Sequence, residues 1–205
     1  MDNIEDIVPV KYNGLFLPKD IADAAYEHLL TKLDWVHKDQ NVPRREYYVH
    51  DKALPYFYGD PKFGRSYDSQ APDPVITMIR RLLFADLGVD FDVVFLNIYD
   101  HERHHLGWHA DDSPEMSDEH PIVTVSLGAE REIWFTPKRG EGRPKDLPAE
   151  RFVFPAKKRL GHGSACVMLP GMQDTHLHRI PKSDRACGPR ISLTFRKFVY
   201  LQTPN

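Results

Sequence analysis

This 205-residue sequence lacks long hydrophobic runs, a basic excess and enough cysteine for a covalent scaffold. No apolar stretch approaches the ~18 residues of a membrane span, and the acidic N-terminus lacks the basic start and apolar stretch of a signal peptide. The only cysteines are Cys166 and Cys187, which excludes a disulfide framework or a cysteine-based zinc module. This favours a reducing compartment, the cytoplasm or, in a eukaryote, the nucleus. The net charge, 27 − 30 = −3 with neutral histidines, counts against a strongly basic nucleic-acid binder.

The sequence does contain the material for a folded domain. Hydrophobic residues make up 41 % of the chain, which is enough to bury a core and excludes wholesale disorder. No repeat and no break in composition divides the chain, so we expect one domain over residues 1–205 and no assembly beyond a monomer. Within it, we expect supporting helices and lid loops over about residues 1–90 and a β core over about residues 91–205.

Two helices are predicted in the first half of the chain. Residues 19–33 carry apolar side chains on one helical stripe. A second helix follows Asp73, which can cap it, has Pro74 in its first turn and stops at Gly88. Residues 41–70, between the two helices, are rich in Tyr, Pro, Arg and Gly and are expected to form loops and short strands.

After Gly88 the hydrophobic pattern changes to a period of two. Strands are predicted over residues 93–99, 122–127, 132–135, 151–154, 165–169, 175–180 and 190–199. Because no helical pattern separates these strands, they indicate a mainly β sandwich, jelly roll or barrel.

Two histidine motifs have the spacing of metal ligands. His109 and Asp111 lie two residues apart, so in an extended segment both side chains point to one side. A later strand carries His176 and His178. Two imidazoles and one carboxylate can form the facial triad that suits Fe(II) and leaves coordination positions open. His-x-Asp alone is a weak signal, and the spacing leaves both later histidines as candidates.

Polar side chains alternate along two of the predicted strands. On the last strand, Arg190, Ser192 and Arg196 share one face with Thr194. That face suits either the wet side of an edge strand or a pair of arginines around a small dicarboxylate. Asn97 and Tyr99 share a face of the strand at 93–99, either as buried polar groups bonded to the backbone or as further contacts to the dicarboxylate.

A basic stretch covers residues 138–159. It holds eight Lys and Arg against three Asp and Glu, 8 − 3 = +5. A solvated loop and a phosphate-contacting patch are equally compatible with this composition.

Together these motifs resemble, in order, those of the AlkB family of Fe(II)- and 2-oxoglutarate-dependent dioxygenases, in the branch that dealkylates nucleic acids. The matching segments are Asn97-Ile98-Tyr99, Trp108-His109-Ala110-Asp111-Asp112, residues 121–128, His178-Arg179-Ile180-Pro181-Lys182 and residues 189–196. Upstream, Pro43-Arg44-Arg45 and residues 55–59 also resemble family features. The resemblance extends over about residues 40–200.

The resemblance implies a double-stranded β-helix, or jelly roll, with iron between its sheets. It implies that His109, Asp111 and His178 are the catalytic iron ligands, with His178 preferred to His176 because of the segment that follows it. Arg190 and Tyr99 would hold the distal carboxylate of 2-oxoglutarate, and Arg196 and Asn97 would lie nearer its iron-bound end. Ser192 stands where the family usually has Asn, and its hydroxyl has less reach toward the cosubstrate.

The resemblance also implies a reaction. With Fe(II), 2-oxoglutarate and O₂, the enzyme would demethylate bases such as 1-methyladenine and 3-methylcytosine in DNA or RNA and release succinate, CO₂ and formaldehyde. The base would be single-stranded or flipped out of a duplex. The same centre acting on another base or on a protein, and a non-catalytic jelly-roll binding module, are the alternatives.

Five residues are candidates for the contact with the nucleic acid. Tyr56 and Tyr58 would sandwich the base, although an aromatic pair in such a loop also suits core packing. Asp112 would favour a cationic base, unless it is an exposed turn residue. Arg44 and Arg45, with the basic stretch, would contact phosphates.

Overall fold

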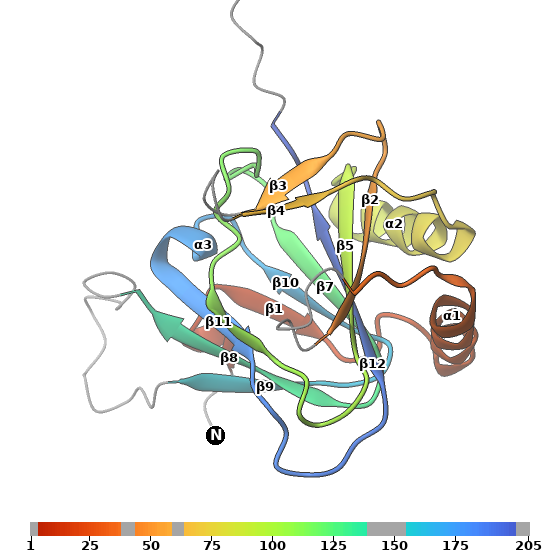
Figure 1. The fold of residues 1–205 in the computed structure, drawn as a ribbon. Coiled ribbons are helices and arrows are strands. Elements are labelled where there is room, and N and C mark those ends of the chain that lie inside the picture. Colours follow the sequence, from red (N-terminus) through yellow and green to blue (C-terminus); the bar gives the residue numbers. More distant parts are fainter. Residues whose placement is uncertain (1–3, 38–43, 59–63, 139–154, 200–205) are drawn as a thin grey trace, which may run out of the picture.

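The computed structural model describes residues 4–37, 44–58, 64–138 and 155–199. Its larger sheet has six antiparallel strands (Figure 1). In spatial order they are β1 (Val10–Asn13), β10 (Ser164–Met168), β7 (Ile122–Gly128), β12 (Arg190–Arg196), β5 (Val93–Tyr99) and β2 (Arg45–His50). β12 therefore lies at the centre of the sheet, between β7 and β5. Its polar side chains are thus not those of a solvent-exposed edge strand.

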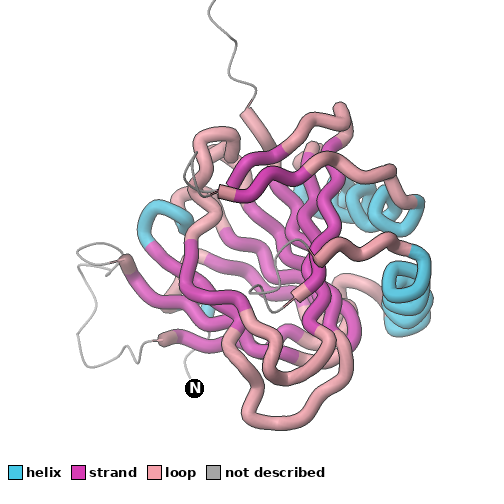
Figure 2. Tube along the Cα trace, viewed as in Figure 1, coloured by secondary structure: helices cyan, strands magenta, loops and turns pink. Residues whose placement is uncertain are grey.

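A smaller antiparallel sheet faces the first one, as in a jelly roll (Figure 2). Its order is β6 (Leu106–His109), β11 (His176–Ile180), β8 (Arg131–Pro137) and β9 (Ala156–Leu160). A separate hairpin consists of β3 (Tyr56–Tyr58) and β4 (Arg65–Tyr67). The predicted mainly β jelly roll is confirmed.

Two helices cover the outer face of the six-stranded sheet. α1 (Lys19–Lys32) and α2 (Pro74–Leu87) pack against Leu96, Val125 and Leu193 in one apolar cluster. Because side chains alternate along a strand, the residues between these point to the opposite face, toward the smaller sheet. Tyr99 accordingly packs with Phe135 of β8 in a second apolar cluster. The polar residues of β5 and β12 thus lie inside the sandwich.

The ends of α2 follow its sequence signals. The Asp73 carboxylate accepts hydrogen bonds from the backbone N–H groups of Val75 and Ile76, and Gly88 ends the helix with φ +70°. α1 begins after Pro18 and has no side-chain cap. The short elements η1 (Ile4–Asp6) and α3 (Met172–Thr175) complete the helical part. None of the helices in the described ranges is long and apolar enough to cross a membrane.

Three strands have no counterpart among the predicted ones. β1 and β6 are only four residues long, and β9 carries Lys157, Lys158 and Arg159 in a run that has no apolar alternation. The strand predicted over residues 151–154 lies outside the described residues. Short strands whose partners are distant in sequence give too weak a local pattern to be recognised.

Candidate metal centre and adjoining cavity

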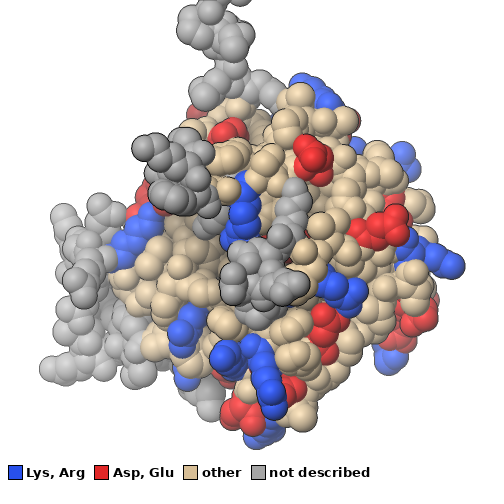
Figure 3. Space-filling model, viewed as in Figure 1, with Lys and Arg blue, Asp and Glu red and all other residues tan. Residues whose placement is uncertain are grey.

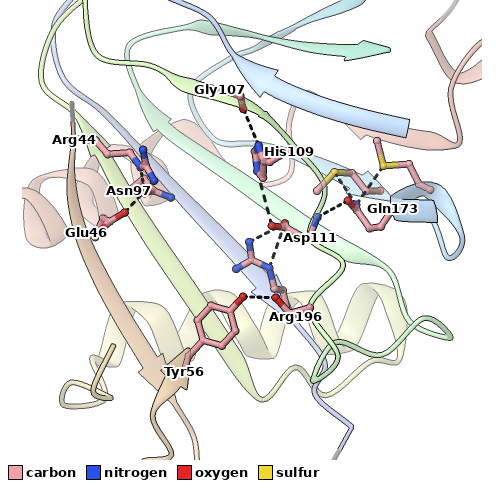
Figure 4. A network of polar contacts seen from close by, with 12 residues as sticks. Arg44, Glu46, Tyr56, Asn97, Gly107, His109, Asp111, Gln173 and Arg196 are labelled. Atoms are coloured by element: carbon pink, nitrogen blue, oxygen red, sulfur yellow. Dashed lines mark hydrogen bonds and ion pairs between the residues drawn. The ribbon is translucent and has the colours of Figure 1, made fainter. Parts of the chain in front are cut away.

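The two sheets bring His109, Asp111 and His178 together. His109 and His178 are opposite each other in the pairing of β6 with β11, and their ring centroids are 4.1 Å apart. Asp111 follows the end of β6, and its Oδ1 lies 3.9 Å from His109 Nε2 (Figure 4). One ligand atom from each of the three residues lies within 4.8 Å of the others. This spacing suits three ligands on one face of a metal ion.

His176 lies outside this cluster although it is on the same strand. It is opposite Pro137 of β8, and its Nδ1 lies 2.9 Å from the Thr175 hydroxyl. Of the two histidines, His178 is therefore the one that lies beside His109.

Asp111 is buried beside a fixed cation. Arg196 donates from Nη2 and Nε to Asp111 Oδ2, at 2.7 and 3.3 Å. Burial raises the pKa of Asp111, but the charge of Arg196 is the largest opposing effect, and the pKa of this carboxyl group lies below its usual value. The backbone N–H of Asp111 donates to Gln173 Oε1 at 2.9 Å. The carboxylate is thus ionised, oriented and left with Oδ1 toward His109.

His178 is held in its neutral form. Burial, followed by the charge of His109, lowers the pKa of His178 to about 3. A neutral imidazole offers the lone pair that a metal ion needs. On His109, Nδ1 lies 2.9 Å from the carbonyl oxygen of Gly107, which fixes the ring and leaves Nε2 facing the cluster (Figure 4).

Arg190 is a fully buried cation with unused donors. Its Nη2 donates to Ser126 Oγ at 2.7 Å, whereas Nε and Nη1 have no hydrogen-bond partner among the described residues. The guanidinium stacks on Tyr99 at 5.4 Å from the ring centroid. Burial lowers the pKa of Arg190 to about 10, so it remains charged at neutral pH. Buried guanidinium groups with unused donors match a carboxylate.

The remaining cosubstrate candidates lie on the same inner face. Ser192 of β12 is opposite Asn97 on β5 and opposite Ser126 on β7. The three polar side chains therefore form one row on the inner face of the sheet. Asn97 Oδ1 already accepts from Arg44 Nε at 2.7 Å, which leaves its amide nitrogen for another partner.

A cavity of about 260 Å³ adjoins the metal-ligand cluster. Its lining residues are Arg44, Glu46, Tyr56, Arg65, Tyr67, Phe95, Asn97, Leu106, Gly107, His109, Asp111 and Arg196. A larger groove, about 490 Å³, lies over Trp134, Lys157 and Arg185. It includes none of the three clustered ligand residues, so the smaller cavity is the one placed for chemistry at the cluster.

Of the candidates for substrate contact, Tyr56 lines this cavity. Its hydroxyl lies 2.7 Å from Ser113 Oγ, and its ring packs with Tyr48 and Tyr67, so it combines core packing with a place in the cavity wall. Burial raises the pKa of Tyr56. Tyr58 belongs to β3, but its side chain lies outside what the structure describes.

Asp112 and Arg44 occupy positions other than those predicted. Asp112 is exposed, accepts from Lys138 Nζ at 3.0 Å and does not line the cavity, whereas the preceding Asp111 is buried and does. Arg44 is buried in the cavity wall between Asn97 and Glu46, where it cannot serve as a surface contact to phosphate.

The basic residues at the surface are largely paired or stacked. Arg45 forms an ion pair with Asp100, and Arg159 lies 3.3 Å from Glu130. Of the basic stretch, residues 139–154 lie outside the described part of the chain. On the face shown in Figure 3, basic and acidic side chains are interspersed.

Sequence reasoning missed two charged residues of the cavity, Glu46 and Arg65. Glu46 is buried within β2 among Tyr47, Tyr48 and Val49, and this carboxylate in an otherwise buried strand was the available signal. Arg65, on the short hairpin strand β4, has no comparable signal in the sequence.

Comparison with known proteins gives a consistent result. Residues 13–196 match the 2OG-Fe(II) oxygenase superfamily. The mouse protein named DNA oxidative demethylase ALKBH2 is 32 % identical over 171 residues, covering 83 % of this chain and 68 % of its own. The human protein of that name is 30 % identical, covering 83 % and 62 %. The bovine alpha-ketoglutarate-dependent dioxygenase alkB homolog 3 is 28 % identical, covering 85 % and 61 %. The chain thus spans about three fifths to two thirds of these relatives.

Solved structures share the fold. The structure of OsALKBH1 superposes with a TM-score of 0.60 at 14 % identity, covering 92 % of this chain and 96 % of that one. A prolyl-4-hydroxylase from Pseudomonas putida gives 0.51 at 13 % identity, covering 95 % and 96 %. At these identities the likeness concerns the architecture alone.

Proposed function

Since this chain belongs to the 2OG-Fe(II) oxygenase superfamily and, within it, to the AlkB family, we propose that it demethylates N-alkylated bases of DNA or RNA by an Fe(II)- and 2-oxoglutarate-dependent oxidation. Bases of the 1-methyladenine and 3-methylcytosine type are the proposed substrates. The proposed products are succinate, CO₂ and formaldehyde.

The observation that carries this proposal is the cluster of His109, Asp111 and His178 inside the sandwich. Two imidazoles and one ionised carboxylate are the donor set that suits Fe(II), and a metal held by these three residues would keep positions open for other ligands. Arg190 would bind the cosubstrate. Its Nε and Nη1 have no partner among the described residues, and a guanidinium group suits the free carboxylate of 2-oxoglutarate.

Each residue then has a defined task. His109, Asp111 and His178 would hold the iron, with Arg196 orienting the carboxylate through its second oxygen. When bound, Fe(II) with 2-oxoglutarate and O₂ supplies an oxidant strong enough for an N-methyl C–H bond, which no side chain provides. The hydroxymethyl group so formed on the base leaves as formaldehyde. The protein contributes position and the exclusion of water.

The cosubstrate would lie between the two sheets. Arg190, with Tyr99 beside it, would bind the distal carboxylate. Asn97, Ser192 and Arg196 lie on the same inner face and would flank the rest of the molecule. Ser126 holds the Arg190 guanidinium through Nη2, which would leave Nε and Nη1 to donate to the carboxylate.

The base would occupy the cavity beside the cluster. Its entry requires a single-stranded or flipped nucleotide, because a base in a duplex cannot reach a buried centre. Tyr56 would contact the base from the cavity wall, with Tyr58 of the same hairpin as the proposed second aromatic. Arg45 and the basic stretch at residues 138–159 would contact the backbone phosphates without reading sequence.

The test is product release from a defined substrate. The full chain would be incubated with Fe(II), 2-oxoglutarate, O₂ and a single-stranded oligonucleotide that carries 3-methylcytosine or 1-methyladenine. We expect succinate and formaldehyde in matched amounts. Succinate without formaldehyde from either oligonucleotide would reject these substrates and point to another base or to protein.

Two histidines of one strand provide a matched pair of controls. His178→Ala removes a proposed ligand, and we expect it to abolish both products and the binding of Mn(II), measured by electron paramagnetic resonance. His176→Ala removes a buried imidazole two residues away, and we expect Mn(II) binding and product release to persist. Loss of binding in His176→Ala with full binding in His178→Ala would reverse the assignment.

A further inference from the structure

Two buried polar atoms of the cavity wall lie side by side with hydrogen-bonding capacity unused. Glu46 Oε1 and Arg65 Nη1 are 3.8 Å apart as an ion pair. Neither atom has a hydrogen-bond partner within the described ranges, although Oε1 also lies 3.0 Å from Arg44 Nη2 as an ion pair. Since buried polar groups are normally satisfied, an acceptor next to a donor here indicates a ligand that supplies the complement.

The surrounding contacts hold this acceptor in place. The Tyr67 hydroxyl donates to the other oxygen of Glu46 at 3.0 Å. Arg44 is fixed in turn by its bond to Asn97 on the neighbouring strand (Figure 4). The carboxylate therefore cannot rotate away when a ligand enters, and it presents Oε1 to the same cavity that reaches His109 and Asp111.

The arrangement discriminates among the bases. On the edge that faces the major groove in a duplex, adenine presents a donor next to an acceptor: its exocyclic amine lies beside ring nitrogen N7. Guanine presents two acceptors there, cytosine an amine without a neighbouring acceptor, and thymine an acceptor beside a methyl group. The Glu46 acceptor and the Arg65 donor complement adenine alone. Methylation of adenine at N1 leaves this edge free.

We propose that Glu46 and Arg65 read the amine and N7 of adenine, and that the site therefore favours 1-methyladenine over 3-methylcytosine. This inference rests on the proposed function. Glu46 would accept from the amine of either base, so Arg65 is the residue that separates them. Asp112, the carboxylate expected from the sequence to select the base, is exposed and lies outside the cavity lining.

The experiment compares three single-stranded oligonucleotides that differ in one base: 1-methyladenine, 7-deaza-1-methyladenine and 3-methylcytosine. The 7-deaza base replaces N7 by a C–H group and so removes the acceptor that Arg65 would contact. Formaldehyde release with Fe(II), 2-oxoglutarate and O₂ gives kcat/KM for each. We expect kcat/KM for 1-methyladenine to exceed the other two by about tenfold.

Variants locate the effect on the protein. Arg65→Met should lower kcat/KM for 1-methyladenine about tenfold and leave the other two substrates within about twofold. Glu46→Gln, which keeps the volume but weakens the acceptor, should lower kcat/KM for all three bases, because each carries the exocyclic amine. Arg185→Met, an exposed arginine outside the cavity, is the matched control and should change none of the three values.

The outcomes separate this inference from the proposed function. Equal kcat/KM for the three bases, or an equal decrease for all of them in Arg65→Met, would overturn the reading of adenine while leaving demethylation intact. An unchanged Glu46→Gln would remove Glu46 from the contact. Conversion of 2-oxoglutarate to succinate without formaldehyde from any oligonucleotide would overturn the proposed function and this inference with it.

Discussion

Two buried arginines next to one tyrosine show how the same residue type serves different ends. Arg190 and Arg131 lie 5.4 and 5.6 Å from the centroid of the Tyr99 ring. Arg131 donates to the carbonyl oxygens of His101, His104 and Pro181 and so connects the loop after β5 with the loop after β11. Arg190 has one bond, to Ser126, and two nitrogens without partners among the described residues. The first is built into the fold, and the second is available to a ligand.

This difference predicts opposite results for the two Met variants. Arg190→Met should lower the affinity for 2-oxoglutarate about 100-fold, because the charge-assisted hydrogen bonds to a carboxylate are lost. It should not lower the melting temperature, because an apolar side chain replaces a buried charge that is incompletely hydrogen-bonded. Arg131→Met should lower the melting temperature by several degrees, because it removes three hydrogen bonds to backbone carbonyl groups of two loops. Isothermal titration of 2-oxoglutarate into the Mn(II) protein and thermal unfolding measure both. A strongly destabilised Arg190→Met with unchanged affinity would show that Arg190 is structural.

The residues of the cluster illustrate what a sequence can reveal about a site. His109 and Asp111 lie two residues apart, and Arg190 and Arg196 share one strand face, so local spacing made each pair a candidate and the order of the motifs along the chain brought them together. The choice between His176 and His178 depends on which strand lies across β11, which is tertiary information. Glu46 and Arg65 meet only because β2 and the β3–β4 hairpin border the same cavity, and no local pattern encodes that meeting.

Among the secondary-structure elements, α2 depends on one side chain at its start. The Asp73 carboxylate accepts from two backbone N–H groups of the first turn and lies 2.8 Å from His28 Nε2 of α1. It thus caps one helix and connects the two helices that cover the large sheet. The helix then buries Ile79 and Leu83 against this sheet.

Removal of this cap should destabilise the protein measurably. Asp73→Ala is expected to lower the free energy of unfolding by about 1–2 kcal/mol, the usual effect of losing an N-cap. Asp86→Ala, an exposed aspartate near the other end of the same helix, should change it by less than about 0.5 kcal/mol. Urea unfolding followed by circular dichroism measures both. Equal stability of the two variants would contradict the role of the cap.

Elements with strong local signals were predictable, and elements defined by pairing were not. α2 has its cap, its proline and its glycine stop within the segment, β5 is a largely apolar run, and β12 alternates between polar and apolar residues along its length. β9 has the basic sequence Lys157-Lys158-Arg159 and is a strand because β8 pairs with it. Lys157 and Lys158 nevertheless find aromatic partners, Trp134 and Tyr12, on opposite faces of the strand. Pairing and cation–π contacts thus replace the missing apolar pattern.

At the scale of the whole molecule, the proposed ligands would connect the two sheets. His109 and His178 come from the small sheet, whereas Arg190 and Arg196 come from the centre of the large one. Arg196 already joins the sheets through Asp111. A metal bound to the histidines and a dicarboxylate held between metal and Arg190 would add a second connection, present only in the folded protein.

Binding of both ligands should therefore raise the melting temperature in two separable steps. At 100 times its Kd, a ligand adds about 2.7 kcal/mol, which corresponds to a shift of about 5–10 °C for a chain of this size. We expect one such shift with Mn(II), and a further shift when 2-oxoglutarate is added. His178→Ala should lose both shifts, because the metal is the anchor for the cosubstrate, whereas Arg190→Met should keep the Mn(II) shift and lose the second. A 2-oxoglutarate shift that persists in Arg190→Met would contradict a cosubstrate bound between the two sheets.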